Sequence, residues 1–372
     1  MARLSGGDPS LLRRLNAIAV LRALYAAEEL TLTELVKASE VSRPTVEEIA
    51  TDLGEQGLIE EVSLSPDAPR PVGRPAKRYR FRPEAGHVAG LEIGPHKALC
   101  LVADLRGDVV GRARADLTPA MAAPDRLGVA HRVLGAAVEG LPNVRVLGVG
   151  TTGVVSGGKV VRGERLPGWT GLDLPAEFGG GCPVLAGNDT KLATLAEHWR
   201  GVAHGVDDVV YVRAGRTVSL GLLLDGNLHA GHNGAAGEIG ALRQVGWYTA
   251  LDRLLAFGDG SGSAEATRRI FEALRDGDPE AEAIVAAFVT DLCVGVAAAV
   301  LTVDPQLVVI GGGLAQAGDL LTAPLRTELA RLCLFPVRVE TSMLGDDSVA
   351  LGAVRLALSR VERELFSVSD VA

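Results

Sequence analysis

Apolar residues recur at every third or fourth position near the start of the chain. They do so between Leu11 and Leu24 and again between Val46 and Leu53, and this spacing predicts two amphipathic helices. Thr33 is expected to cap a short helix over the intervening segment ELVKAS. Three short helices with apolar faces are thus predicted within the first 60 residues.

The third helix begins with a capping pattern. Ser42 can cap it, and Pro44 falls in its first turn, where the missing N–H is not needed. Gly57 ends the helix; LIEEVSL is then predicted to form a strand, and KRYRF its returning partner across a loop rich in Pro and Gly. Helix, helix, short turn, helix and two-stranded wing is the order of a winged helix-turn-helix domain, which we expect over residues 1–83.

In that fold the helix after the turn enters the major groove of DNA, and a wing can contact the phosphate backbone. The alternative is a small helical domain that binds another protein. The candidate DNA contacts are three residues at the start of the third helix and three basic residues of the wing: Ser42, Arg43, Thr45, Arg74, Lys77 and Arg78.

Charge changes this picture in two ways. The net charge of −9 argues against a general nucleic-acid binder, yet residues 70–82 hold six basic residues and no acid, which favours DNA over a protein partner. Glu47, Glu48 and Asp52 make the third helix acidic, and phosphates repel carboxylates. We therefore expect the affinity for DNA to come largely from the wing and from dimerisation.

Beyond Gly86 the pattern changes to alternating strands and helices. Apolar strands are predicted at HVAGLEI, KALCLVADL, RVLGVGTTGVV, PVLAGN, VVYVRAG and LVVIGGG, and helices over 125–140, 190–200, 280–303 and 319–333. The opening run of strand, glycine turn, strand, D-x-x-G turn and strand resembles the first three strands of the actin-like, sugar-kinase ATPase fold. An α/β body is expected.

Over residues 10–365 the chain resembles the ROK family (repressors, open reading frames and sugar kinases), whose regulator branch places a winged helix before a kinase-like body. The segments that carry the resemblance are SRPTV, VGRPAKRYRF, LPGW, GNDTKLATLAEHWRG, LDGNLHAGHNGAAGEIG and LVVIGGGLAQAGDLL, in that order. It implies two RNase H-like lobes: a small lobe of residues 84–187 plus 352–372, and a large lobe of residues 188–351.

The resemblance also implies roles for individual residues. Asn188 and Asp189 match the family's Asn-Asp pair, in which the Asp is the base of the kinases, and Glu238 matches a ligand of the sugar hydroxyls. Without a ligand the pair would be a helix cap, and Glu238 an exposed turn residue. The run Gly311, Gly312 and Gly313 matches the turn under the adenosine, or is a plain strand-to-helix turn.

Two phosphate turns depart from the kinase pattern. Residues 92–96, EIGPH, stand where the kinases carry D-x-G-G-T, so Glu92 shifts the carboxylate by one methylene and Pro95 removes a backbone donor. In residues 215–221, GRTVSLG, Thr217 and Ser219 replace two glycines of G-T-G-I-G-x-G, and we expect strain because side chains are disfavoured at positive φ. ATP and Mg²⁺ are therefore not expected as cofactors.

The family's zinc site is also incomplete. Ala241 stands where its histidine would be, and no Cys or His lies between Gly240 and Ser261, so no zinc is expected. Arg243, Trp247 and Tyr248 are assigned instead to a repacked lobe or a dimer surface. Four widely spaced cysteines and the absence of an uninterrupted membrane-length apolar run predict a cytoplasmic protein with no membrane partner.

These features together predict a DNA-binding transcription regulator, not an enzyme, whose kinase-derived body serves for dimerisation and ligand sensing. The expected partners are a double-stranded DNA operator, a sugar or sugar phosphate held by Asn188, Asp189 and Glu238 between the lobes, and further copies of the chain in a homodimer or homotetramer. The alternative is an ATP-dependent sugar kinase with an added DNA-binding domain, in which Asp189 is the base.

Overall fold

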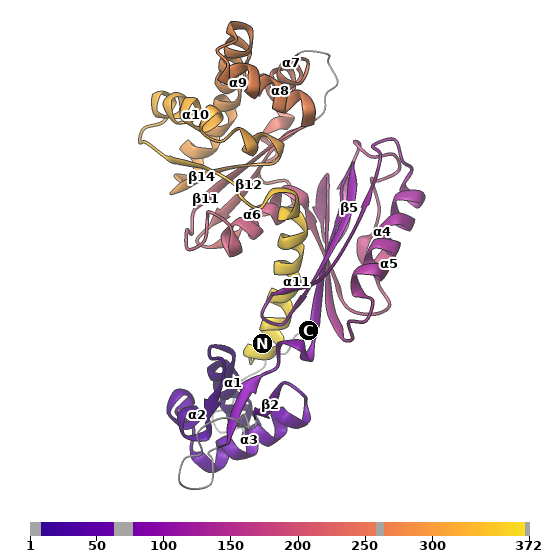
Figure 1. The fold of residues 1–372 in the computed structure, drawn as a ribbon, viewed down its shortest axis with the longest axis vertical. Helices are drawn as coiled ribbons and strands as arrows, with labels where there is room; N and C mark the ends of the chain where they lie inside the picture. The colour runs from indigo at the N-terminus through magenta and orange to yellow at the C-terminus, as the bar shows by residue number, and fades with distance from the viewer. Residues whose placement is uncertain (1–8, 63–76, 258–263, 369–372) are drawn as a thin grey trace.

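The structure is a computed structural model of the chain and describes residues 9–62, 77–257 and 264–368. It has three parts (Figure 1): a small helical domain at one end, and two α/β lobes side by side at the other. Helix α11 (Ser348–Phe366) runs from the junction of the two lobes to the small helical domain.

The N-terminal domain is a winged helix-turn-helix, as predicted. Its three helices pack around one apolar core, and its short antiparallel sheet has the strand order β1-β3-β2. The elements are α1 (Pro9–Tyr25), β1 (Leu30–Thr31), α2 (Leu32–Ser39), α3 (Arg43–Glu55), β2 (Ile59–Val62) and β3 (Arg78–Phe81).

The predicted cap of α2 is wrong by two residues. Thr31, not Thr33, is the N-cap: its hydroxyl accepts from the Glu34 backbone N–H at 3.3 Å, and the Glu34 carboxylate accepts from the Thr31 N–H at 2.7 Å. This reciprocal pair needs an acid three residues after the Thr, and only Thr31 has one. Ser42 does precede α3, but its hydroxyl bonds to Thr45 Oγ1 at 2.8 Å and not to a backbone N–H.

The small lobe is built on a five-stranded sheet. Strands β4, β5 and β6 are antiparallel, whereas β7 and β10 run parallel to β4. Helix α4 covers one face and α11 the other, because alternate residues of the central strands, such as Val88 and Ala89, point to opposite faces. In spatial order the strands are β10 (Val184–Asn188), β7 (Val144–Thr151), β4 (His87–Ile93), β5 (Lys97–Asp104) and β6 (Val109–Asp116).

Shorter elements complete this lobe. They are the 3₁₀ turn η1 (Pro83–Ala85), helix α4 (Ala123–Val138), the hairpin of β8 (Val154–Ser156) with β9 (Lys159–Arg162), and helix α5 (Leu174–Phe178).

The large lobe has a second five-stranded sheet, in the order β13 (Asn227–Leu228), β12 (Val218–Leu224), β11 (Val209–Ala214), β14 (Leu307–Gly311) and β15 (Arg338–Thr341). Helices pack one face of it into an apolar core, and α6 (Asp189–Arg200) packs on the other. The remaining elements are η2 (Ile239–Ala241), η3 (Arg243–Val245), α7 (Trp247–Leu255), α8 (Ala264–Arg275), α9 (Pro279–Val303), η4 (Gly313–Ala317), α10 (Asp319–Leu332) and η5 (Gly345–Asp347).

Helix α9 is long and apolar enough to cross a membrane by length and composition. It packs instead as a central helix of the large-lobe core, where Phe288, Leu292 and Val296 are buried. Asp291 interrupts its apolar sequence and pairs with Arg253 of α7 at 2.7 Å. Its hydropathy is thus accounted for by core packing.

Helix α11 lies in close contact with both its neighbours because the contact positions are glycines. A Cβ atom on Gly148 of β7 would overlap the backbone of Ala353, and one on Gly352 would overlap the backbone of Leu192 in α6. The helix is therefore packed tightly between the small-lobe sheet and α6.

The N-terminal domain shares a continuous apolar core with the small lobe. The Tyr25 ring lies 5.2 Å from both the Phe81 ring and the Phe366 ring, measured between centroids. Two arginines add hydrogen bonds across this contact. Arg22 Nη2 donates to the Phe366 carbonyl at 2.9 Å, and Arg106 Nη2 donates to the Ala27 carbonyl at 2.8 Å. The N-terminal domain is thus packed against the end of α11.

Candidate functional site

Asn188 and Asp189 stand where β10 ends and α6 begins, at the junction of the two lobes. Asn188 is the N-cap of α6: its Oδ1 accepts from the Lys191 backbone N–H at 3.1 Å. Its Nδ2 donates to the Gly153 carbonyl at 2.8 Å and to Asp189 Oδ1 at 3.1 Å. Both amide hydrogens are therefore engaged within the protein.

The Asp189 carboxylate is buried and has partners at both of its oxygens. Its Oδ2 lies 2.6 Å from Arg213 Nη1. Its Oδ1 accepts from the Thr190 backbone N–H at 2.8 Å, from Thr190 Oγ1 at 3.3 Å and from Asn188 Nδ2 at 3.1 Å. Each carboxylate oxygen offers about two lone-pair positions, so Oδ1 is fully occupied, whereas Oδ2 accepts from Arg213 alone among the described residues.

Arg213 is the partner of Asp189, and the sequence reasoning missed it. It lies near the end of β11. The Asp189 carboxylate raises the pKa of Arg213 more than any other group, and Glu92 adds to the effect. The guanidinium is therefore firmly charged. The available signal was a single charged residue at the end of the apolar run VVYVRAG, but nothing in the sequence named its partner.

Glu92 stands where the kinases carry the Asp of D-x-G-G-T, and it is buried on β4. Its Oε2 lies 3.2 Å from Lys97 Nζ, an ion pair without hydrogen-bond geometry, and Lys97 also donates to the Asp346 carbonyl. Burial raises the pKa of Glu92, whereas Lys97 and Arg213 lower it. A divalent ion would have to displace this ammonium, so these residues do not fit Mg²⁺. Within residues 9–62, 77–257 and 264–368, no group of three His, Cys, Asp or Glu could hold a metal.

Glu238 differs from Asp189 and Glu92 because its carboxylate oxygens remain available to accept hydrogen bonds. It is half-buried before η2, and across the described ranges its carboxylate takes no hydrogen bond. Burial raises its pKa, whereas the positive charges of Lys191 and Arg165 lower it. Lys191 itself is buried, with its Nζ donating to the Gly234 carbonyl at 2.9 Å.

The loop that carries Glu238 is pinned by Trp247. The indole is buried, donates from Nε1 to the Leu292 carbonyl of α9 at 3.2 Å, and packs against Gly240 and Gly295. Trp247 therefore belongs to the lobe core and not to a dimer surface. Tyr248 next to it is half exposed, and the Arg165 guanidinium of the small lobe lies 5.6 Å from its ring centre.

The expected strain in the turn after β11 is absent. Strands β11 and β12 form a regular antiparallel hairpin in which Arg213 pairs with Ser219, and the Gly215 N–H bonds to the Thr217 carbonyl at 3.1 Å. Neither Thr217 nor Ser219 has a positive φ, so their side chains cost no backbone strain. Ser219 Oγ bonds instead to Thr190 Oγ1 at 2.6 Å.

The three glycines after β14 adjoin this hairpin. A Cβ atom on Gly311 would overlap the Tyr211 hydroxyl, and Gly312 has a φ of 78°, so both positions need glycine. A Cβ on Gly215 would lie 3.5 Å from the Gly313 nitrogen. The two turns are neighbours, and a nucleotide-like role for Gly311–Gly313 stays a prediction.

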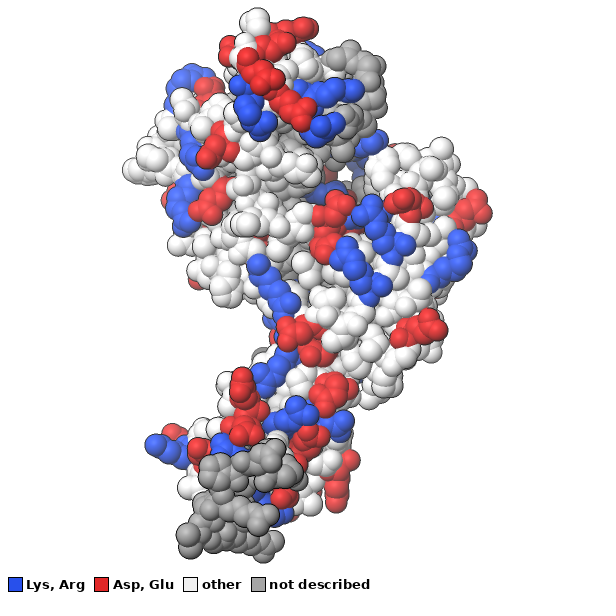
Figure 2. Space-filling view, in the orientation of Figure 1, with Lys and Arg blue, Asp and Glu red and all other residues white. Residues whose placement is uncertain are grey.

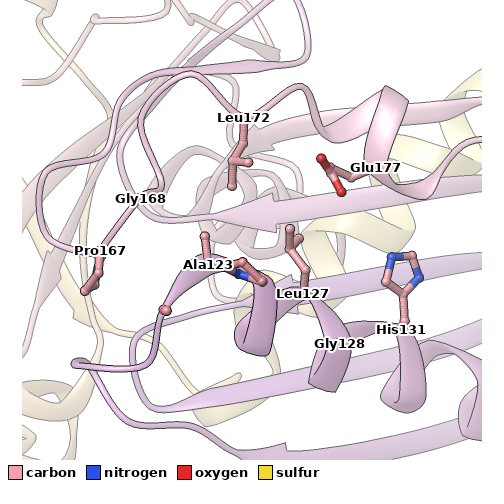
Figure 3. Close-up of a pocket in the computed structure, with 10 residues that line it drawn as sticks. Ala123, Leu127, Gly128, His131, Pro167, Gly168, Leu172 and Glu177 are labelled. Carbon is pink, nitrogen blue, oxygen red and sulfur yellow. The ribbon is translucent and has the colours of Figure 1, made fainter.

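A cavity of about 720 Å³ lies elsewhere, on the small lobe (Figure 3). The start of α4 faces the loop that holds Pro167 and Gly168, with His131 and Glu177 at one end. Its lining is mostly apolar and includes none of the predicted ligand residues.

In the winged helix-turn-helix domain the predicted basic contacts within the described residues are paired with acids; Arg43 and Lys77 are exposed, whereas Arg78 is half-buried. Arg43 lies 3.2 Å from Glu47, Lys77 2.7 Å from Glu61, and Arg78 2.8 Å from Glu29. Figure 2 accordingly shows acidic and basic side chains interspersed on this domain. Exposed ion pairs contribute only about 0.2–1 kcal/mol, so a phosphate can replace the carboxylate. Arg74 lies outside the described residues.

Comparison with known proteins agrees with this architecture. A model of the ROK family matches residues 88–245 and 249–360, and a model of the IclR helix-turn-helix domain matches residues 15–63. The chain belongs to the ROK family. This ROK protein is 21% identical over 398 residues to the xylose repressor of Caldicellulosiruptor bescii, covering 95% of the chain and 98% of the relative.

ROK kinases match a smaller part of the chain. The glucokinase of Thermotoga maritima is 28% identical over 253 residues, covering 58% of the chain and 80% of the kinase. A solved ROK family transcriptional regulator, a homologue of the E. coli MLC protein, covers 96% of the chain and 98% of its own (TM-score 0.71, 20% identity). The xylose repressor and this solved regulator, unlike the glucokinase, thus match almost the whole of this ROK protein.

Proposed function

We propose that this ROK protein is a DNA-binding transcription regulator whose kinase-like body senses a sugar-derived ligand and does not phosphorylate it. The observation that carries the proposal is the winged helix-turn-helix domain packed onto a kinase-like body whose Asp189 carboxylate is held by Arg213 at 2.6 Å. The full-length match to a xylose repressor supports it.

The absence of phosphorylation follows from the state of Asp189. A general base must accept the proton of the substrate hydroxyl through a free lone pair within hydrogen-bond reach. In this chain Thr190 and Asn188 occupy Oδ1, and Oδ2, the remaining acceptor, is held in a 2.6 Å ion pair with the Arg213 guanidinium. The test is sugar-dependent ADP formation by the full chain with ATP and Mg²⁺, and turnover with any of glucose, xylose or N-acetylglucosamine would favour the kinase alternative.

The proposed ligand lies between the lobes. Glu238 is its direct contact, because that carboxylate has open acceptors, while Asn188 and Asp189 shape the wall beside it. Calorimetric titration of the full chain with monosaccharides and their phosphates tests this arrangement, with Glu238→Gln as the variant that loses binding. Retained operator binding with no saccharide bound would remove ligand sensing and leave DNA binding intact.

Helix α11 connects the ligand site to the DNA-binding domain. It packs on α6, whose first residue is Asp189, and it ends at Phe366 against Tyr25 of α1. Both contacts are close, so a change in the angle between the lobes moves the DNA-binding domain with it. Hinged motion between packed elements is a common basis of such switches.

We further propose that the regulator acts in the cytoplasm as a homodimer or homotetramer. Two of its winged helix-turn-helix domains then bind the two halves of a pseudo-palindromic operator. Helix α9 supports self-association, because Val294 and Leu301 on its outer side are about half exposed. Light scattering of the wild type and of Val294→Glu with Leu301→Glu tests this surface; a monomeric wild type would contradict it.

A further inference from the structure

Helix α3 has an exposed polar stripe on the side away from its apolar face. The apolar side chains packed into the core of the N-terminal domain are Val46, Ile49, Ala50 and Leu53. Arg43, Glu47 and Thr51 follow one another at intervals of four residues, about one helical turn, and all three are exposed. In a helix-turn-helix domain the exposed side of this helix faces the base edges of the major groove. The stripe is therefore the part of α3 that can read a sequence.

The three acids of α3 have different partners. Arg13 of α1 engages two of them, since its Nη2 donates to Asp52 Oδ2 at 2.6 Å and lies 3.0 Å from Glu48 Oε1. Both of these carboxylates are thus held toward α1 and away from the stripe. Glu47 has a separate partner in Arg43, whose Nε donates to Glu47 Oε1 at 3.2 Å. Glu47 is therefore the acid that remains on the stripe.

The pairing with Arg43 leaves one oxygen of Glu47 available. Across the described ranges Oε1 accepts from Arg43 Nε, and Oε2 accepts no hydrogen bond. The neighbouring guanidinium also offsets the repulsion between this carboxylate and the phosphates of DNA. Because Nε alone holds Glu47, the two Nη groups of Arg43 can contact a phosphate at the same time.

We infer that Glu47 reads a cytosine in each half of the operator, with its Oε2 accepting from the amino group of the base and Arg43 contacting the phosphate beside it. This inference rests on the proposed binding of DNA through α3. In the major groove, cytosine presents an amino donor at N4, whereas guanine and thymine present acceptors that repel a carboxylate. Adenine also has an amino donor, but its N7 acceptor lies next to it. Glu47 therefore favours cytosine over the other three bases.

In vitro selection of random duplexes by the full chain and by three variants tests this reading. The wild type should enrich half-sites in which one position is fixed as C·G. Glu47→Ala should lose the preference at that position and keep the others. Glu47→Gln should shift it toward A·T, because an amide can donate to N7 of adenine and accept from its N6. Glu48→Ala is the matched control: it removes the neighbouring exposed acid and should enrich the site of the wild type.

Fluorescence anisotropy with two duplexes measures the size of the effect. Changing the fixed C·G pair to T·A removes the amino donor and places an acceptor in the major groove. Binding of the wild type should weaken about tenfold or more, as is typical for a mismatched pair, and binding of Glu47→Ala should weaken about twofold or less.

The possible results separate this reading from DNA binding as such. A wild-type site without a fixed C·G pair, or a C·G preference that survives Glu47→Ala, would overturn the inference and leave DNA binding standing. Loss of that preference in Glu48→Ala alone would also overturn it, because the reading would then belong to Glu48. Selection without any enriched sequence would overturn the proposed DNA binding as well.

Discussion

The Arg213 guanidinium lies 2.6 Å from the Asp189 carboxylate, which makes a fixed ion pair of the residue that a kinase of this family would use as its base. The pair joins β11 of the large lobe to the first turn of α6. Both elements belong to the large lobe, so the pair fixes the start of α6 on the large-lobe sheet and engages the Oδ2 atom that could accept the proton of a sugar hydroxyl.

Replacing Arg213 with Ala should leave the buried Asp189 carboxylate without its positively charged partner. We expect the free energy of unfolding to fall by about 3 kcal/mol, as is typical when one partner of a buried pair is removed. Urea denaturation measures this change. The double variant with Asp189→Asn should recover part of the loss, because the stranded charge is gone; strictly additive losses would show that the two residues are not coupled.

Trp247 should control the stability of the Glu238 loop. Trp247→Phe keeps most of the ring and loses the bond to the Leu292 carbonyl, for an expected cost of about 1 kcal/mol, whereas Trp247→Ala leaves a cavity and should cost about 3–5 kcal/mol. Chemical denaturation gives both values. Tyr248→Ala is the neighbouring control on the exposed side, and an equal loss there would contradict the role given to the buried indole.

The ion-paired arginine and lysine of the DNA-binding domain should contact phosphates. Arg43→Ala and Lys77→Ala should each reduce the slope of log affinity against log salt by about one unit. Fluorescence anisotropy at several salt concentrations measures this slope. Arg275→Ala, far along the chain in the large lobe, should leave it unchanged, and an unchanged slope in Arg43→Ala or Lys77→Ala would place that residue off the DNA backbone.

Phe366 should make the DNA-binding domain and the kinase-like lobes unfold cooperatively. Phe366→Ala removes the ring that lies 5.2 Å from Tyr25, so calorimetry should show the DNA-binding domain melting in a separate transition at lower temperature. Phe335→Ala removes an exposed ring and should leave the profile of the wild type. A wild type that already melts in two separate steps would contradict the shared core.

Much of this architecture could be predicted from local patterns. The winged helix-turn-helix and the strands and helices of the body follow from hydrophobic spacing and turn residues, as at Ser42 and Pro44. The cap at Thr31 could also have been found, because the Glu that completes its capping box stands three residues later.

The ligand site was less accessible to such reasoning. The partner of Asp189 is 24 residues away, on strand β11, and no local pattern specifies that contact. The same holds for Lys97 beside Glu92, and for Tyr25 against Phe366 at the opposite end of the chain. The strain expected at Thr217 and Ser219 assumed a kinase turn, whereas the chain forms an ordinary hairpin there.

In vitro selection of random DNA duplexes by the full chain tests the central claim most directly. The account predicts enrichment of an inverted repeat whose half-sites lie about one helical turn apart, and loss of that enrichment when Ser42, Arg43 and Thr45 are replaced together. Selection that yields no common sequence, or enrichment that survives these replacements, would contradict a DNA-reading regulator.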